Sequence, residues 1–470
     1  MATIPKPATV LERCRVAPAP PPNGSDAAEH PQTLPLVFSD MVWLHFHPTQ
    51  RLLFYKFPCS KDHFIEHIVP NFKKPLSQAL KHFLPFAGNL IYEIDSGNIP
   101  ELQYRPGDSV PVTVAESNEA SDFDYLSGDR PRDAGEFYAF FPDFPPDKIE
   151  SGWKKIPLLA VQITLFPDTG ICIGFNNNHI VGDASSVVGF IKAWSSICRH
   201  GGDEEFSSAT HLHPFYDRSV IKDPTGLLNN YWNQMKHVKI ESPPLNFPTN
   251  KLRATYILQK SDIQNLRNLV QAQKQDLVHL SSFTITTAYV WTCLAKSSAA
   301  AGEEVAADET EYFVFAVDAR QRINPPAPAT YFGNCVVPAF AESTHSELKG
   351  KNGFLTAVGL VGDVISKKAN NKDEILRGAD EWLAKLGGMI GKRLFGVAGS
   401  PKFDLYDADF GWGNPNKYES VGIDVDGSMS LCKSREFEGG LEIGLSLPKK
   451  KMDAFGDVFC GGLKITEQTS

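Results

Sequence analysis

Two strands and a helix follow one another in residues 158–197, which read LLAVQITLFPDTGICIGFNNNHIVGDASSVVGFIKAWSSI. The β-rich runs on either side of Pro167–Gly170, a turn signal, predict a β-hairpin. Apolar side chains at helical spacing over residues 185–197 predict a helix, and Ser185 or Ser186 is expected to cap its start. The second strand therefore gives way to a helix after a polar turn.

A histidine and an aspartate lie in that turn, as His179-Ile-Val-Gly-Asp183. A histidine at a strand end can face a cleft, and its ordinary pKa near 6.5 suits a general base at neutral pH. The motif is weak in isolation, because about 0.6 such His/Asp spacings arise by chance in a chain of this composition. A structural histidine is the alternative interpretation.

A second motif, Tyr406-Asp-Ala-Asp-Phe-Gly-Trp-Gly413, lies more than 200 residues further on. Two glycines around an indole indicate a tight turn, and a buried tryptophan N–H needs a hydrogen-bond partner. A packed aromatic turn without a catalytic role is the alternative. The sequence contains no Gly-x-Ser-x-Gly elbow, phosphate-binding glycine loop or His-Glu-x-x-His motif.

Composition excludes several classes of protein. The 470 residues carry a net charge of −9 and have no run of lysine and arginine, which argues against nucleic acid as a partner. No apolar stretch reaches the roughly 18–20 residues that span a bilayer, and the N-terminus lacks the pattern of a secretory signal. Eight cysteines without a Cys-x-x-Cys pair favour reduced thiols, no metal site and a cytoplasmic location.

The rest of the chain divides into two halves. Residues 1–34, rich in proline, predict a loose arm with one early strand, and residues 62–83 predict a helix broken at Pro70 and Pro75. Residues 200–250 lose periodicity and predict a long crossover. Beyond it, the pattern predicts helices at 261–273 and 283–296 and strands at 312–317 and 441–447.

Together, His179-x-x-x-Asp183 and Asp409-Phe-Gly-Trp-Gly413 resemble the BAHD family of plant coenzyme A-dependent acyltransferases. The resemblance covers nearly the whole chain and includes further segments: Leu34–Phe38, Arg51–Tyr55, Leu84–Asn89, Tyr216–Pro224, Tyr331–Cys335 and Val397–Asp404. The last three are similar to the branch that acylates anthocyanins and other phenolic glycosides. Many members have a second histidine where this chain has Asn178, but some glycoside-acylating members share the asparagine.

The resemblance implies an α/β fold of the chloramphenicol acetyltransferase type, with two similar mixed-sheet domains and a channel at their interface. The expected boundaries are an N-terminal domain at 1–205 that carries His179, a crossover at 206–250, and a C-terminal domain at 251–470. Acyl-CoA would enter the channel from one face and the hydroxyl acceptor from the other. A monomer is expected.

The resemblance also implies roles for site residues. His179 is expected to remove the proton from an acceptor hydroxyl, and Trp412 or a backbone N–H to stabilise the oxyanion. Asp183 is expected to point away from the cleft and to pair with Arg320. Asp409 is expected to hold the Gly-Trp-Gly turn.

Coenzyme A is expected as a co-substrate, with no bound cofactor and no metal. Lys251, Arg253, Ser282, Phe283 and Lys402 lie in segments that resemble coenzyme A-facing parts of the family. The expected reaction moves a malonyl group from malonyl-CoA to a sugar hydroxyl, commonly the 6-position of glucose, of an anthocyanin, flavonoid or other phenolic glucoside.

Three alternatives stay open. A hydroxycinnamoyl donor, such as coumaroyl-CoA or caffeoyl-CoA, would need an aromatic-lined slot, whereas malonyl needs a cationic pocket for its carboxylate; the segment Gly182–Ser186 favours malonyl. A non-catalytic protein that binds phenolic glycosides or coenzyme A is a different class. A hydrolase, in which water replaces the acceptor, is the third.

Overall fold

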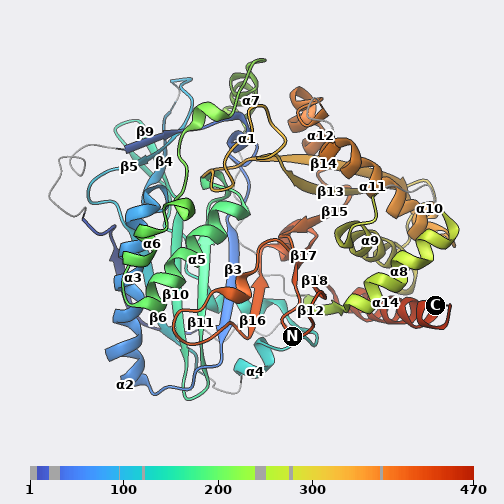
Figure 1. The fold of residues 1–470 in the computed structure, drawn as a ribbon, viewed down its shortest axis with the longest axis horizontal. Helices are drawn as coiled ribbons and strands as arrows, with labels where there is room; N and C mark the ends of the chain where they lie inside the picture. The colour runs from blue at the N-terminus through green and yellow to red at the C-terminus, as the bar shows by residue number, and fades with distance from the viewer. Residues whose placement is uncertain are drawn as a thin grey trace.

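The computed structural model of the chain describes residues 8–20, 32–94, 96–118, 122–238, 250–274, 279–370 and 374–469. Three sheets and the helices packed on them form the molecule (Figure 1). Among these described residues, no helix combines the length and apolar character needed to cross a membrane.

The first sheet has six strands of mixed direction and contains the predicted hairpin. In spatial order they are β1 (Thr9–Val16), β6 (Val110–Glu116), β10 (Leu159–Phe166), β11 (Gly170–Asn177), β3 (Thr49–Tyr55) and β16 (Lys417–Ser420). β10 and β11 pair antiparallel, from Leu159 opposite Asn177 to Phe166 opposite Gly170. Both strands are buried throughout, because helices cover one face of the sheet and the aromatic segment η4 (Ala134–Phe140) covers the other.

The second sheet has seven strands, also of mixed direction. In spatial order they are β14 (Val336–Thr344), β13 (Thr310–Asp318), β15 (Arg393–Ala398), β17 (Ser428–Lys433), β18 (Leu441–Pro448), β12 (Lys251–Leu258) and β7 (Arg132–Asp133). A third, antiparallel sheet contains β2 (Gln32–Pro35), β5 (Glu101–Tyr104), β4 (Asn89–Glu93), β9 (Trp153–Pro157) and β8 (Lys148–Glu150). The predicted α/β class with mixed sheets is therefore confirmed.

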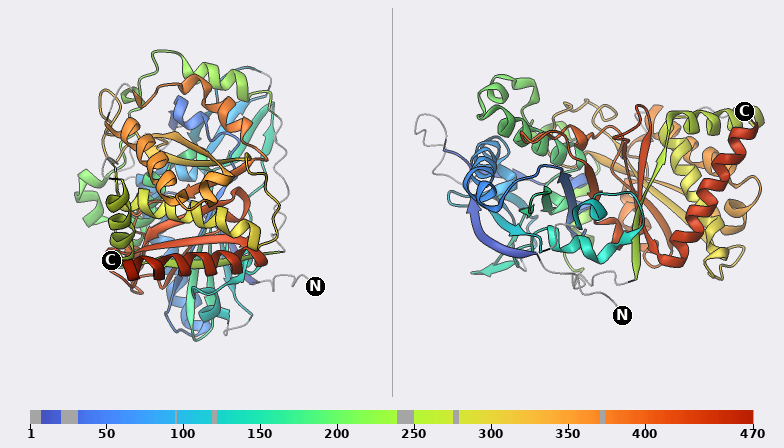
Figure 2. Two further views of the ribbon diagram at one scale, coloured as in Figure 1. Left: turned by 90° about the vertical axis from the view of Figure 1, so that its right-hand side faces the viewer. Right: turned by 90° about the horizontal axis from the view of Figure 1, so that it is seen from below.

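Helices cover the sheets in two groups, seen at opposite sides of Figure 1. The α-helices are α1 (Phe38–Met41), α2 (Lys61–His63), α3 (Val69–His82), α4 (Asp122–Leu126), α5 (Ala184–His200), α6 (Glu204–Ser208), α7 (Leu227–Met235), α8 (Lys260–Gln273), α9 (Ser282–Ala300), α10 (His345–Lys349), α11 (Gly353–Asn370), α12 (Trp382–Gly388), α13 (Ile423–Asp426) and α14 (Lys449–Thr469). Short 3-10 helices occur at η3 (Leu84–Ala87), η5 (His179–Val181), η6 (Thr210–Leu212), η7 (Arg218–Val220), η9 (Ala379–Glu381) and η10 (Leu405–Asp407). Figure 2 shows the long C-terminal helix α14, in red, lying beside α8 and α9 in the second half of the chain.

Most of the predicted elements are present. The early strand is β1, the helices at 261–273 and 283–296 are α8 and α9, and the strands at 312–317 and 441–447 are β13 and β18. The crossover at 200–250 contains α6, α7 and two 3-10 turns, and its residues 239–249 lie outside the described part. The predicted domain boundaries stay a prediction.

The helix predicted over 62–83 is not interrupted at Pro75, and this expectation was wrong. Pro75 lies inside α3, and the irregular part is the π-helical turn η2 (Phe64–Ile68) just before Pro70. A proline leaves the carbonyl four residues earlier without its helical partner. Here the Asn71 carbonyl accepts from Cys198 Sγ at 3.7 Å and the Phe72 carbonyl from Trp194 Nε1 at 3.3 Å. Helix α5 therefore compensates for the hydrogen bond that Pro75 lacks.

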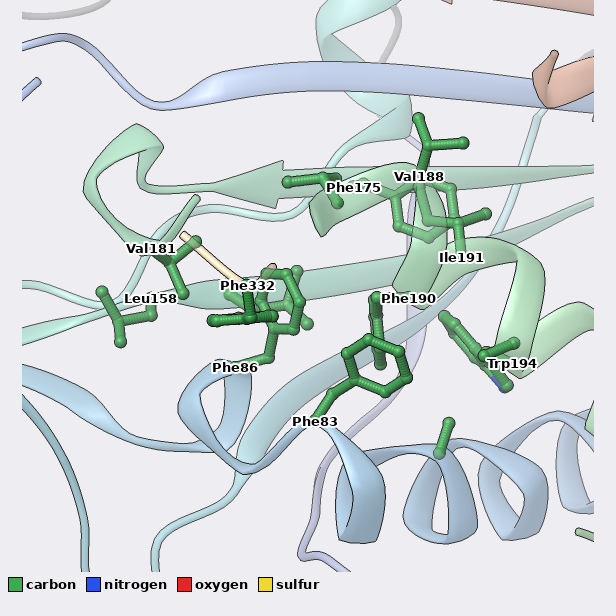
Figure 3. Close-up of a cluster of buried hydrophobic side chains, with 14 of the residues drawn as sticks. Phe83, Phe86, Leu158, Phe175, Val181, Val188, Phe190, Ile191, Trp194 and Phe332 are labelled. Atoms are coloured by element: carbon green, nitrogen blue, oxygen red, sulfur yellow. The ribbon is translucent and has the colours of Figure 1, made fainter. Parts of the chain in front are cut away.

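Aromatic side chains fill the space between α3, α5 and the turn η3. Figure 3 shows Phe83, Phe86 and Phe190 gathered there, with Phe332 from the second half of the chain inserted among them. The ring of Phe86 lies 4.6 Å from that of Phe190 and 5.5 Å from that of Phe332. The core of the first half is thus completed by a residue from the second.

The two large sheets each include a strand from the other half of the chain. β16 follows residue 400 yet pairs with β3, and β7 precedes the hairpin yet pairs with β12. Glu419 on β16 lies 2.8 Å from Arg132 on β7 and 3.1 Å from Arg253 on β12. These side chains are at most 3% exposed, so the ion pairs link the two sheets through the interior.

Glu419→Gln tests this link. Burial raises the pKa of Glu419, but Arg132 and Arg253 outweigh it and bring the pKa to about 2, against about 4.3 in an unfolded chain. Its contribution to stability is therefore complete above about pH 4.3 and is lost as the pH falls towards 2. Breaking a buried pair from one side costs about 3–5 kcal/mol, so we expect the variant to unfold at a lower denaturant midpoint at pH 7.

The matched control is Glu150→Gln, which removes an exposed carboxylate beside Lys155. Its denaturation midpoint should equal that of the unmodified chain. A Glu419→Gln variant as stable as this control would show that the buried cluster does not hold the sheets together.

Candidate active site

His179 begins the 3-10 turn η5, directly after strand β11 and its polar end. Asn178 caps this turn by accepting from the Ile180 N–H at 3.3 Å. The imidazole stacks on the indole of Trp43 with the ring centroids 3.8 Å apart and the planes 11° apart. Phe46 approaches the edge of the same ring at 5.5 Å. Two aromatic side chains therefore hold the imidazole in one orientation.

The environment keeps His179 neutral. Burial lowers its pKa to about 4, with the charge of Arg51 acting in the same direction and that of Asp183 opposing it. At pH 7 the imidazole is therefore unprotonated and can accept a proton. Nδ1 is buried and has no hydrogen-bond partner among the described residues.

Asp183 directs both of its carboxylate oxygens away from the imidazole. Oδ2 accepts from Arg320 Nη1 at 2.8 Å and from the Cys335 N–H at 3.0 Å. Oδ1 accepts from Arg320 Nη2 and from the backbone N–H groups of Ser185 and Ser186. Asp183 is therefore the cap of α5, in place of the serine predicted for that role, and the ion pair with Arg320 is present.

The segment Tyr331–Cys335 fastens the histidine turn from the other side. Asn334 Nδ2 donates to the carbonyl of His179 at 3.1 Å, and the Asn334 N–H donates to the buried carboxylate of Asp40 at 2.8 Å. Gly333 has φ +129°, and a β-carbon there would lie 1.9 Å from Arg218 Nη1. Only glycine allows this close passage.

Trp412 lies far from His179, at the opposite end of strand β3. Its indole packs 5.4 Å from the ring of Tyr55, at the last residue of β3. The His179 end of the sheet is at the first residue, Thr49, which donates to Asn177 Oδ1 at 2.8 Å. Six residues of extended strand separate Thr49 from Tyr55, a distance of about 20 Å.

Asp409 holds the turn that carries this tryptophan. Its Oδ1 accepts from the N–H groups of Gly411 at 2.8 Å and Gly413 at 2.9 Å. Both glycines have positive φ, +93° and +83°, which few other residues adopt. The motif thus closes a loop against β3, where the hydroxyl of Tyr55 donates to the Ala408 carbonyl at 2.7 Å.

The five residues predicted to contact coenzyme A do not form one cluster. Arg253 is 1% exposed and its guanidinium contacts Asp424 at 2.5 Å, so it is a structural residue and not a phosphate ligand. Lys251 begins β12, whereas Lys402 follows the end of β15. Because β15 runs parallel to β12, the two lysines lie at opposite ends of the strands of this sheet.

The remaining two residues lie at the start of α9. Ser282 accepts from Arg267 at 3.4 Å, and the ring of Phe283 lies 5.5 Å from that of Phe315. Lys402 is exposed. Lys251, Ser282, Phe283 and Lys402 stay predicted contacts.

Several residues at the site were not identified from the sequence. Trp43, Phe46 and Asp40 lie in and just after α1, a region without a recognised motif, and reach the histidine only through the folding of the chain. Arg51 and Asn334 belong to segments noted for their family resemblance, which was the only available signal.

Comparison with known proteins identifies the family. Residues 9–459 match the family model that is described as "Transferase family". The chain belongs to this family. The resemblance to the BAHD acyltransferases is therefore confirmed.

The similar curated proteins of the family are plant enzymes. The chain is 46% identical to the malonyl-coenzyme:anthocyanin 5-O-glucoside-6'''-O-malonyltransferase of Salvia splendens, covering 96% of this chain and 94% of the relative. It is also 46% identical to phenolic glucoside malonyltransferase 1 of Nicotiana tabacum, covering 97% and 99%. The coumaroyl-CoA:anthocyanidin 3-O-glucoside-6''-O-coumaroyltransferase 2 of Arabidopsis thaliana is 35% identical, covering 99% of each chain.

A solved structure shares the fold of this chain. Vinorine synthase superimposes with a TM-score of 0.67 at 22% identity, covering 95% of this chain and 96% of that one. The expected fold type is therefore confirmed.

Trp412→Phe tests the separation of the two motifs. Removal of an oxyanion donor lowers kcat by about 100- to 1000-fold. Because phenylalanine keeps most of the packing on Tyr55 and the indole is remote from His179, we expect kcat of the variant to fall by much less than about 100-fold. Turnover and thermal stability should be measured together. A 100-fold loss of kcat with an unchanged Tm would place the indole at the reaction centre.

Proposed function

We propose that the chain transfers the malonyl group of malonyl-CoA to the 6-hydroxyl of a glucosyl group on an anthocyanin, flavonoid or other phenolic glucoside. The observation that carries the reaction type is a neutral, oriented His179 held at the seam of the two halves by Asp183, Arg320 and Asn334. The malonyltransferases among the relatives, at up to 46% identity, support the donor and the acceptor.

In the proposed mechanism, Nε2 of His179 takes the proton of the sugar hydroxyl as its oxygen attacks the thioester carbonyl. The tetrahedral intermediate collapses with cleavage of the C–S bond. The imidazolium then returns the proton to the departing thiolate, which leaves as free coenzyme A. No covalent acyl-enzyme forms, and Asp183 contributes by fixing the turn on which His179 lies.

The substrates are proposed to meet in a channel between the N-terminal part, 1–205, and the C-terminal part, 251–470. Lys251, Ser282, Phe283 and Lys402 are our proposed contacts for coenzyme A. We further propose that the enzyme acts as a cytoplasmic monomer without a bound cofactor.

The reaction is tested by incubating the protein with malonyl-CoA and coumaroyl-CoA together and a flavonoid glucoside. Malonylation adds about 86 Da to the mass of the acceptor, and we expect this product to dominate in mass spectrometry. His179→Ala is the control and should form no product above background. Exclusive coumaroylation would contradict malonyl-CoA as the proposed donor. Consumption of acyl-CoA without an acceptor would indicate a hydrolase.

The pH dependence tests the state of His179. The imidazole accepts a proton only while it is neutral. With a pKa of about 4, His179 stays neutral, and the enzyme active, at pH values well below the ordinary histidine pKa of about 6.5. We expect kcat/KM to keep its neutral value at pH 5.5 and to fall towards pH 4. Aliquots returned to pH 7.5 should recover full activity. An acid limb centred near the ordinary value of about 6.5 would contradict the assignment.

A further inference from the structure

Arg51 is a cation on β3, the strand whose first residue lies at the His179 end of the sheet. It lies on β3 opposite Phe175 of β11, and its Nη1 donates to Asn177 Oδ1 at 2.9 Å and to Thr49 Oγ1 at 3.0 Å. Asn177 is two residues before His179. The guanidinium is therefore directed towards the reaction end of the sheet, on the same face as Asn177.

Arg51 differs from the fully buried arginines in its partners. Arg132, Arg218, Arg253 and Arg320 each lie within 3.5 Å of a carboxylate. The partners found for Arg51 in the described parts of the chain are neutral oxygens, and no carboxylate there lies within 4 Å of it. A partly buried guanidinium whose described partners are all neutral keeps its positive charge unneutralised, so it can bind an anion.

The charge of Arg51 lowers the pKa of two groups near it, His179 and Tyr418. It acts with burial in lowering the pKa of His179, and it offsets part of the rise in pKa that burial causes at Tyr418. Tyr418 lies on β16, opposite Leu53 and thus on the same face of the sheet as Arg51. The phenol of Tyr418 is therefore a neighbour of the Arg51 guanidinium on this face.

The chemistry of a malonyl thioester requires a cation at such a place. Its free carboxylate carbon is two bonds, about 2.5 Å, from the thioester carbonyl carbon. The reacting carbonyl must lie about 3–3.5 Å from the hydroxyl that His179 activates. With the hydroxyl at hydrogen-bond distance from the imidazole, the carboxylate carbon lies at most about 9 Å from it, in the region that Arg51 faces.

We propose that Arg51 binds the free carboxylate of the acyl donor and thereby selects a dicarboxylic acyl group. This inference rests on the proposed malonyl transfer and assigns the donor subsite within it. A structural role for Arg51, limited to holding Asn177 and the turn that follows it, makes a different prediction: its loss would slow every donor equally.

The test compares Arg51→Gln with the unmodified enzyme on malonyl-CoA and acetyl-CoA, which differ by the carboxylate alone. A hydrogen bond to a charged group contributes enough for about a 10- to 100-fold change in rate. We expect kcat/KM for malonyl-CoA to fall by this factor while that for acetyl-CoA is unchanged or rises. Arg51→Lys, which keeps the charge but not the fork of donors, should fall between the two.

Arg15→Gln is the matched control. Arg15 lies on β1 at the far edge of the same sheet, and its partners in the described part of the chain are neutral oxygens of Ser109. It should leave the ratio of the two donors unchanged, which excludes an effect of net charge alone.

The outcomes separate the two proposals. An unmodified enzyme that does not use malonyl-CoA overturns the proposed function and the inference with it. An enzyme that uses malonyl-CoA, but whose Arg51→Gln variant loses both donors equally or keeps its malonyl preference, overturns the inference alone. Turnover of acetyl-CoA by the variant shows that it is folded.

Discussion

The ion pair between Asp183 and Arg320 is the contact on which the site depends. It joins residues 137 apart, and Asp183 also caps α5 and accepts from the Cys335 N–H. Arg320, the start of α5 and the Cys335 N–H thus converge on one carboxylate that is 4% exposed. Because an unpaired charge is costly in the interior, this set of contacts forms together or not at all. The turn that carries His179 is fixed as a consequence, although Asp183 does not touch the imidazole.

Exchange of strands between the halves extends the same principle to the whole molecule. Each large sheet is completed by a strand from the other half, and Glu419 connects the two exchanged strands through Arg132. Residues of the second half, among them Phe332, Trp382 and Phe410, belong to the core that is centred on the first half. The halves cannot separate without exposing both buried charge and aromatic surface, so the seam between them is a rigid place for a reaction.

The two sequence motifs have different tasks. The turn with His179 lies at one end of β3 and the turn with Trp412 at the other, about 20 Å away. The first supplies a neutral base, and the second closes a loop by hydrogen bonds from two glycine N–H groups to Asp409. Their joint presence in the sequence indicates the family, but it does not place them in one site.

The sequence by itself determined the hairpin, the helix after it, the main elements of the second half, the family and the histidine. These follow from period, turn residues and short motifs, which depend on neighbours in the chain. Only the tertiary structure decided that Pro75 stays helical, that Arg253 is buried in ion pairs, that Trp412 is remote, and that Trp43 and Arg51 border His179. Each of these depends on contacts between residues distant in sequence. Burial and charge, which set the pKa of His179, arise from such contacts, so no local pattern encodes them.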